Sequence, residues 1–251
     1  MKLRQRDMRG HYSSRNCSGF LFPRFVFRYN DSMDKIIDRK WRTLISRARL
    51  FRYVPFLDFA LVAGSMAMGT AREDSDFDVI VGARSGRIFT VRFASVVLFQ
   101  LFGWRRKRLD HKGEARDKIC LNHFVTPASY CLQPPYGSYW RMLYEKLVPI
   151  VGDPNIIEGF FAANRVWAGH SCVYRSDPRH RYRKAWIVRL IERMFSNSLG
   201  DLFESFMKDM QMRRIRQSIA STISTGYRPR IIANEIELEF HPDTKRIEIF
   251  E

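Results

Sequence analysis

The stretch from residue 61 to residue 81, LVAGSMAMGTAREDSDFDVIV, constrains the fold of this chain more than any other. An apolar run ends at Gly64 and Ser65, and a polar loop follows. Asp76 and Asp78 then alternate with apolar residues. Because successive side chains of a strand point to opposite faces, the two aspartates leave the same face of one strand. We therefore expect their carboxylates to be neighbours.

Two neighbouring carboxylates require compensation, which a divalent cation can supply. Like charges about 4 Å apart repel by roughly 4 kcal/mol at an effective dielectric constant of about 20. Mg²⁺ favours one or two protein carboxylates together with water and phosphate oxygens. The Gly64-Ser65 turn offers backbone N–H groups that can approach a phosphate, because glycine has no Cβ. The pattern predicts Mg²⁺ or Mn²⁺ on Asp76 and Asp78; a solvated edge strand after a tight turn is the alternative.

Gly64-Ser65 followed by Asp76-Phe77-Asp78 resembles the nucleotidyltransferase superfamily of the DNA polymerase beta type. The resemblance implies an α/β (α+β) fold in which a small mixed sheet is flanked by helices. It also implies an enzyme that moves a nucleoside monophosphate from an NTP such as ATP to an acceptor hydroxyl of RNA, a protein or a small molecule. Asp76 and Asp78 would be the catalytic, metal-binding residues, and Gly64 and Ser65 would bind the nucleotide phosphates.

Complete members of that family carry a third carboxylate on a later strand. Residues 117–125, DKICLNHFV, are predicted to form this strand. Alternation places Asn122 where the third acid is expected, and an asparagine can neither take a proton nor carry the charge. Asp117, at the start of the strand, is the other candidate. Three alternatives stay open: Asp117 substitutes, two carboxylates suffice, or catalysis has been lost.

The net charge of +17 favours a polyanionic partner. If catalysis has been lost, the chain is expected to be a basic RNA-binding module that keeps the fold. The candidate polyanion contact is the cluster Arg105, Arg106, Lys107 and Arg108, which follows an apolar segment over residues 88–102. A solvated helix end and an interfacial membrane contact are competing uses of this cluster. The apolar segment is shorter than the roughly twenty residues that span a bilayer, and we expect no membrane contact.

Hydrophobic periodicity predicts the elements of the rest of the chain. Helices are expected over residues 34–53, 65–69, 88–102, 139–147, 155–167, 182–195 and 199–223, and a buried strand over residues 56–63. Residues 151–154 are expected to form a loop. Near the C-terminus, Glu235, Glu237 and Glu239 alternate with apolar residues, which favours a solvent-facing edge strand over a metal site. A turn at residues 243–245 would let residues 246–250 pair back.

Three parts are expected along the chain. Residues 1–30 form a basic, loosely ordered leader, residues 31–130 the nucleotidyltransferase-like domain, and residues 131–251 a mainly helical region that ends in a β-hairpin. His123 is expected to be an interior residue and not a base. The four cysteines lack metal-ligand spacing, and there is no secretory signal, so we expect free thiols in a reducing cytoplasm. The sequence leaves the base, the acceptor and the oligomeric state open.

Overall fold

The computed structural model describes residues 31–106, 115–134, 136–180, 183–222 and 230–241. The chain divides into two compact units, residues 1–31 and 32–251, and the account below concerns the second. The predicted leader therefore lies outside the described residues.

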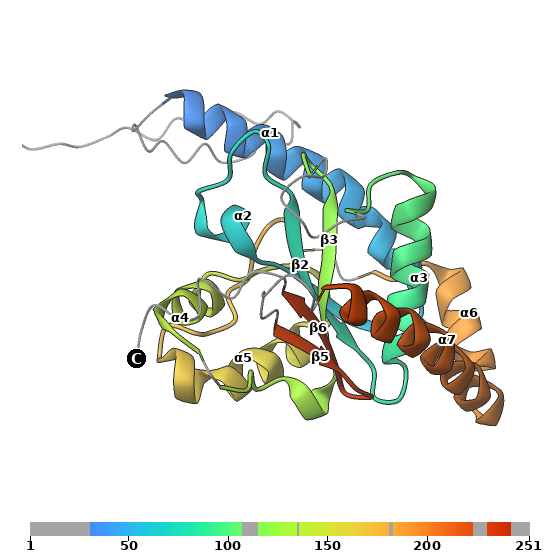
Figure 1. Ribbon diagram of the computed structural model, residues 1–251. Helices are drawn as coiled ribbons and strands as arrows, with labels where there is room; N and C mark the ends of the chain where they lie inside the picture. Colours follow the sequence, from blue (N-terminus) through green and yellow to red (C-terminus); the bar gives the residue numbers. More distant parts are fainter. Residues whose placement is uncertain (1–30, 107–114, 135, 181–182, 223–229, 242–251) are drawn as a thin grey trace, which may run out of the picture. The chain divides into compact units, whose positions relative to one another are not determined.

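A six-stranded mixed sheet organises this unit, with strand order β4-β1-β2-β3-β6-β5 (Figure 1). Its strands are β1 (Leu57–Val62), β2 (Phe77–Ala83), β3 (Ile119–Val125), β4 (Val148–Gly152), β5 (Arg230–Ala233) and β6 (Glu237–His241). β2 and β3 are parallel, and the other neighbouring strands are antiparallel. The predicted α+β fold with a mixed sheet is confirmed.

Helices pack on both faces of the sheet (Figure 1). They are α1 (Asp31–Ala48), α2 (Gly64–Met68), α3 (Ile88–Leu101), α4 (Ser138–Glu145), α5 (Pro154–Ala168), α6 (Trp186–Met194) and α7 (Ser198–Thr222), with short 3₁₀ helices η1 (Arg49–Tyr53) and η2 (Pro127–Ser129). Val79 and Val81 of β2 pack with residues of α1, α3 and α7 on one face. Ile80 packs with α4 and α5 on the other. Alternation along β2 thus separates two apolar layers. Among the described helices, none combines the length and apolar character needed to cross a bilayer.

The region after residue 130 supplies half of the strands in the sheet. The prediction of a loop at residues 151–154 is wrong in part, because β4 extends to Gly152 and pairs with β1. β4 is a short edge strand containing Pro149, which the edge of a sheet tolerates and a central strand does not. A short strand of this composition carries little periodicity for a sequence pattern to detect.

A C-terminal hairpin is present among the described residues and is formed by β5 and β6. Asn234 makes its turn, since its side-chain oxygen accepts hydrogen bonds from the backbone N–H groups of Ile236 and Glu237. The turn predicted at residues 243–245 lies outside the described residues. Glu237 and Glu239 are buried, contrary to the prediction of a solvent-facing edge strand. β6 is also not an edge strand, because it lies between β3 and β5.

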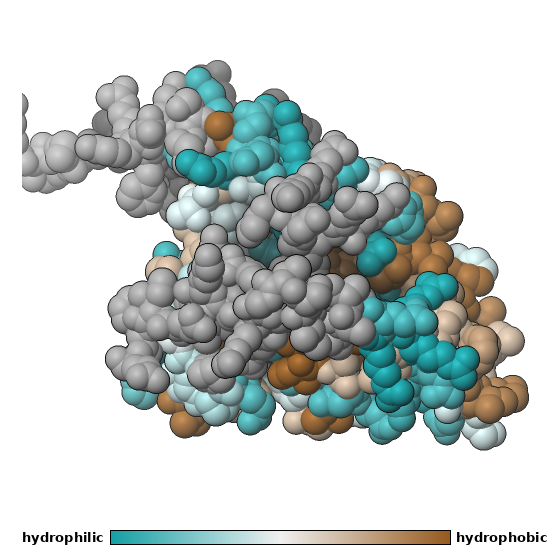
Figure 2. All heavy atoms as spheres, in the orientation of Figure 1, coloured by the Kyte–Doolittle hydropathy of each residue, from teal (hydrophilic) through white to brown (hydrophobic). Residues whose placement is uncertain are grey.

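Exposed apolar side chains gather on α3, α6 and α7, and Figure 2 shows hydrophobic residues together on that side. Those that are more than half exposed are Leu101, Phe102, Trp186, Met194, Leu199, Leu202 and Phe206. Clustered apolar exposure of this kind is typical of surfaces that contact other molecules.

A buried lysine fastens α1 to the loops that precede β2 and β3. The Lys40 ammonium, in a side chain that is 1% exposed, donates to Asp117 Oδ1 at 2.8 Å and to the Ser75 carbonyl at 2.8 Å. Asp117 has a φ of 58°, in the left-handed region that costs a non-glycine residue about 1–2 kcal/mol. The ion pair therefore compensates both a buried charge and a strained backbone.

Replacing Asp117 with asparagine should lower the free energy of unfolding by about 3 kcal/mol, because the Lys40 ammonium then stays buried without its carboxylate. Asparagine tolerates the left-handed backbone, so the change isolates the charge. Urea unfolding followed by circular dichroism measures the difference. Glu73→Gln, which removes an exposed partner of Arg39, is the control and should leave the midpoint unchanged. Equal effects of the two substitutions would contradict the structural role of the buried pair.

Candidate functional site

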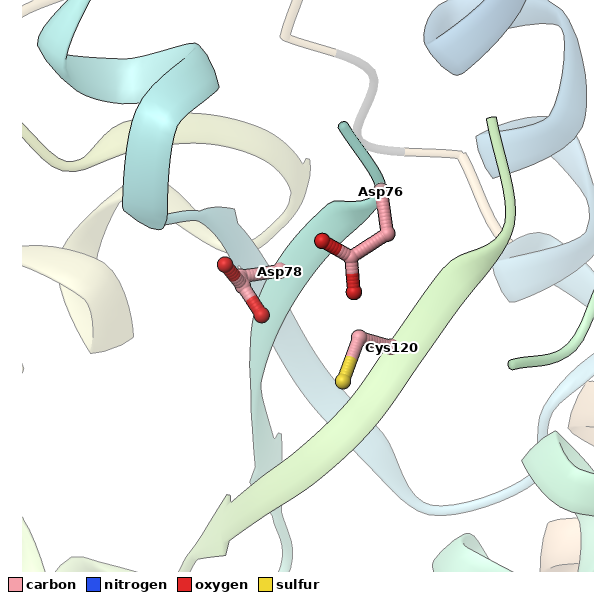
Figure 3. Close-up of side chains that lie close together, drawn as sticks. All are labelled: Asp76, Asp78 and Cys120. Carbon is pink, nitrogen blue, oxygen red and sulfur yellow. The ribbon is translucent and has the colours of Figure 1, made fainter. Parts of the chain in front are cut away.

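Asp76 and Asp78 meet a third side chain at the start of β2. Asp76 directly precedes the strand, and Asp78 is its second residue. Their carboxylate oxygens and the Sγ atom of Cys120 lie within 4.8 Å of one another. Figure 3 shows the three side chains converging on one space between β2 and β3. The two aspartates are therefore neighbours, as their alternation predicts.

Gly64 lies directly against Asp78. A Cβ built on Gly64 would stand 2.2 Å from Asp78 Oδ2, and the φ of Gly64 is +60°. The Ala63 N–H donates to the Asp78 carbonyl at 2.9 Å, which ties the end of β1 to β2. Ser65 follows in the first turn of α2 and is half-buried. Both the contact and the backbone conformation therefore require glycine at this position.

Cys120, and not Asn122, occupies the position opposite Asp78. The parallel register pairs Asp78 with Cys120, and an irregularity then shifts the pairing to Ile80 with His123. The extra residue is in β3, between Cys120 and His123. The simple alternation that was used to place Asn122 therefore does not hold along the whole strand. Simple alternation already places residues 120 and 122 on one face of the strand, so Cys120 could have been considered from sequence. The sequence pattern did not give the register between the two strands, which decides which of them lies opposite Asp78.

Asp117 does not complete the site either. It is held by Lys40 at 2.8 Å and lies 3.9 Å from the Arg116 guanidinium. Among the described histidine, cysteine, aspartate and glutamate residues, the group at this site contains Asp76, Asp78 and Cys120. A thiol thus stands where the resemblance leads one to expect a carboxylate.

The Cys120 thiol is held in its protonated form. Burial raises its pKa well above the ordinary value, and the charges of Asp78 and Asp76 raise it further. A hydrogen bond with Asp78 acts in the same direction. At neutral pH this side chain therefore carries no charge and is a poor ligand for hard cations, which prefer oxygen donors.

Arg106 belongs to the site, although the sequence suggested a role in polyanion binding. Its Nη1 atom lies 2.6 Å from Asp76 Oδ2. Burial lowers the pKa of Arg106, but the charge of Asp76 and their hydrogen bond outweigh it and raise the pKa overall. Arg105 is half-buried, and burial lowers its pKa. Lys107 and Arg108 lie outside the described residues. Nothing in the sequence pattern distinguished Arg106 from the other residues of the basic cluster.

Comparison with known proteins gives no relative from which to assign the site. No family model, curated protein or solved structure matches this chain. The interpretation of the site therefore depends on its own geometry and chemistry.

Replacing Gly64 with alanine should displace the Asp78 carboxylate and weaken Mn²⁺ binding. Gly69→Ala is the matched control, because Gly69 also has a positive φ, +72°, but a Cβ there would meet nothing within 4 Å. Both variants should lose about 1–2 kcal/mol of stability from the strained backbone. Only Gly64→Ala should also reduce Mn²⁺ affinity, measured by isothermal titration calorimetry. Unchanged affinity in a folded Gly64→Ala protein would contradict a site that includes Asp78.

Proposed function

We propose that this protein is a metal-dependent nucleotidyltransferase that moves a nucleoside monophosphate from an NTP, such as ATP, to an acceptor hydroxyl. The supporting observation is the convergence of Asp76 and Asp78 beside Gly64, where the missing Cβ lets the loop after β1 reach Asp78. The acceptor is a hydroxyl of RNA, a protein or a small molecule. The proposed compartment is the cytoplasm, where the free thiols of Cys120 and Cys172 stay reduced.

The donor set fits one Mg²⁺, or Mn²⁺, bound through Asp76 and Asp78. Mg²⁺ commonly takes one or two carboxylates and completes its coordination with water and substrate phosphates. The protonated thiol of Cys120 adds no oxygen ligand. Because Gly64 has no Cβ, there is room for the Asp78 carboxylate beside the turn. When bound, the ion would neutralise charge on the triphosphate and on the leaving pyrophosphate.

The chain's own residues would bind and orient the nucleotide. Backbone N–H groups at Gly64 and Ser65 would donate to the terminal phosphates. Arg106, which now pairs with Asp76, would offer its guanidinium to a phosphate once Asp76 engages the cation. These contacts would align the α-phosphorus with the acceptor oxygen, so the P–O bond to the β-phosphate breaks as the new bond forms.

The proton of the acceptor hydroxyl would leave to water or to one of the two aspartates. Cys120 cannot receive it as a neutral thiol, because it already holds its own proton. A third carboxylate that could act as the base is not part of this group among the described residues. The proposed enzyme therefore works with two carboxylates, by positioning and by charge neutralisation.

Transfer of label from an α-labelled NTP onto RNA, protein and small-molecule acceptors, in the presence of Mg²⁺, tests the proposal. The Asp76→Asn, Asp78→Asn double variant should lower the rate at least about 100-fold, since charge stabilisation at the site is lost. Asp74→Asn is the control, because Asp74 lies in the exposed loop that precedes β2. This variant should keep the wild-type rate of label transfer. Transfer by the double variant at the wild-type rate, or no transfer by the wild type to any acceptor, would refute the proposal.

Replacing Cys120 with aspartate should add the third carboxylate and tighten Mn²⁺ binding by about tenfold, since affinity rises with ligand charge. Without metal, the variant should unfold at lower temperature than the wild type, because three carboxylates then repel one another. Mn²⁺ should restore the midpoint. Cys120→Ser, which adds no charge, should leave the affinity unchanged. A folded Cys120→Asp protein with wild-type Mn²⁺ affinity would show that residue 120 does not face the bound cation.

A second candidate function is a basic RNA-binding module that keeps the fold without turnover. The thiol in the third position and the net charge of +17 favour it. Arg213, Arg214 and Arg216 are exposed near the end of α7. Such a protein would bind RNA with an affinity that falls steeply with salt and that survives loss of Asp76 and Asp78. The double variant described above therefore separates the two functions.

A further inference from the structure

A second group of metal-ligating side chains lies between β3 and β6. The ring nitrogen of His123 and carboxylate oxygens of Glu237 and Glu239 lie within 4.8 Å of one another. His123 is 2% exposed, Glu237 4% and Glu239 0%. The antiparallel register places His123 opposite Glu239, and Glu237 two residues away on the same face of β6. The strand pairing itself therefore gathers these three donors.

The spacing of the donors suits a small cation. A tetrahedral ion with bonds of about 2.1 Å separates its donor atoms by roughly 3.4 Å. His123 Nε2 and Glu237 Oε1 are 3.1 Å apart, and the third donor atom lies within 4.8 Å of both. The Glu239 side chain has three rotatable bonds, through which its carboxylate can adjust toward a bound ion.

The chemistry of the donors selects the class of ion. One imidazole nitrogen with two carboxylates is a mixed set that suits Zn²⁺ and other first-row transition-metal ions, whereas Mg²⁺ prefers oxygen alone. With a neutral imidazole the three side chains carry a charge of −2, so a divalent ion makes the group neutral as a whole. Neutrality matters because these side chains are almost completely removed from solvent.

We propose that His123, Glu237 and Glu239 bind a first-row transition-metal cation, with Zn²⁺ as the reference ion, that fastens the C-terminal hairpin to β3. Three protein ligands leave one coordination position, which a water molecule fills. The pairing of β3 with β6 covers only residues 123–125 and 237–239, and two of these pairs contain the proposed ligands. The ion thereby adds a bond between strands that are distant in sequence. This inference is independent of the proposed nucleotidyl transfer.

Zn²⁺ binding to the full chain tests the proposal in an Asp76→Asn, Asp78→Asn background, which removes the first site as a source of bound metal. The background protein is stripped with chelator, equilibrated with Zn²⁺ and dialysed, and its metal content is measured by elemental analysis. We expect one tightly held ion per chain and a higher unfolding temperature with Zn²⁺ than without it, because binding stabilises the folded state. His123→Gln and Glu239→Gln should each weaken the affinity at least about 100-fold.

Glu235→Gln is the matched control, because Glu235 is on the same hairpin but exposed and paired with Lys208. It should keep the bound ion. If the control loses Zn²⁺ as the ligand variants do, or if the ligand variants keep it, the proposal is wrong. If neither ligand variant folds, Co²⁺ is added to the background protein and its absorption spectrum tests the proposal. The absorption spectrum of a four-coordinate Co²⁺ site supports the proposal, and that of the hydrated ion overturns it. A proton shared between His123 and Glu237 in place of a metal would likewise give only the hydrated-ion spectrum.

Discussion

The close approach of the loop after β1 to Asp78 sets the geometry of the candidate site. Gly64 lies so close to Asp78 that a Cβ at this position would be 2.2 Å from the Asp78 carboxylate. The adjacent Ala63 N–H donates a hydrogen bond to the Asp78 carbonyl. One loop thus lies against both the side chain and the main chain of Asp78. Asp78 is left to face Cys120 across the parallel pair. β2 also carries Asp76 at its start, and its parallel pairing with β3 brings Cys120 to the same place.

The fold could be predicted from the sequence wherever a long helix or strand has a clear hydrophobic periodicity. The helices at residues 31–48, 88–101 and 154–168 and the strands at 57–62 and 119–125 coincide closely with the predicted ranges, and a strand at 77–83 follows Asp76 as the alternation of Asp76 and Asp78 predicts. β4 escaped prediction because a five-residue edge strand shows almost no periodicity. Its pairing with β1 is decided by tertiary packing, which local pattern does not record.

The candidate site could be predicted from the sequence only in part, for a different physical reason. Alternation within one strand is a local property, and it correctly paired Asp76 with Asp78. The identity of the third group depends on the register between two strands, which pairs Asp78 with Cys120. The burial of Glu237 and Glu239 depends on the strand order, which makes β6 an interior strand. Alternation within one strand shows neither its register with the next strand nor its place in the sheet.

The two candidate metal-binding groups differ in how their neighbouring carboxylate charges are compensated. Asp76 is balanced by a guanidinium that a substrate phosphate could take over, so its compensation is exchangeable. The group on β3 and β6 is closed to solvent and contains its own imidazole donor. An open site with replaceable partners suits turnover, whereas an enclosed site suits permanent binding. The sheet thus carries the proposed catalytic site at the start of β2 and the proposed structural site farther along β3.

The position of β6 in the chain has a consequence for synthesis on the ribosome. His123 and Glu237 are 114 residues apart. At translation rates of 5–20 residues per second, roughly 6 to 23 s pass between the emergence of one and of the other. In a sheet formed by β1, β2 and β3 before β6 is made, β3 would be an outer strand with N–H and C=O groups unpaired along one side. An edge of this kind can pair with other chains, and in the folded sheet the pairing with β6 covers it.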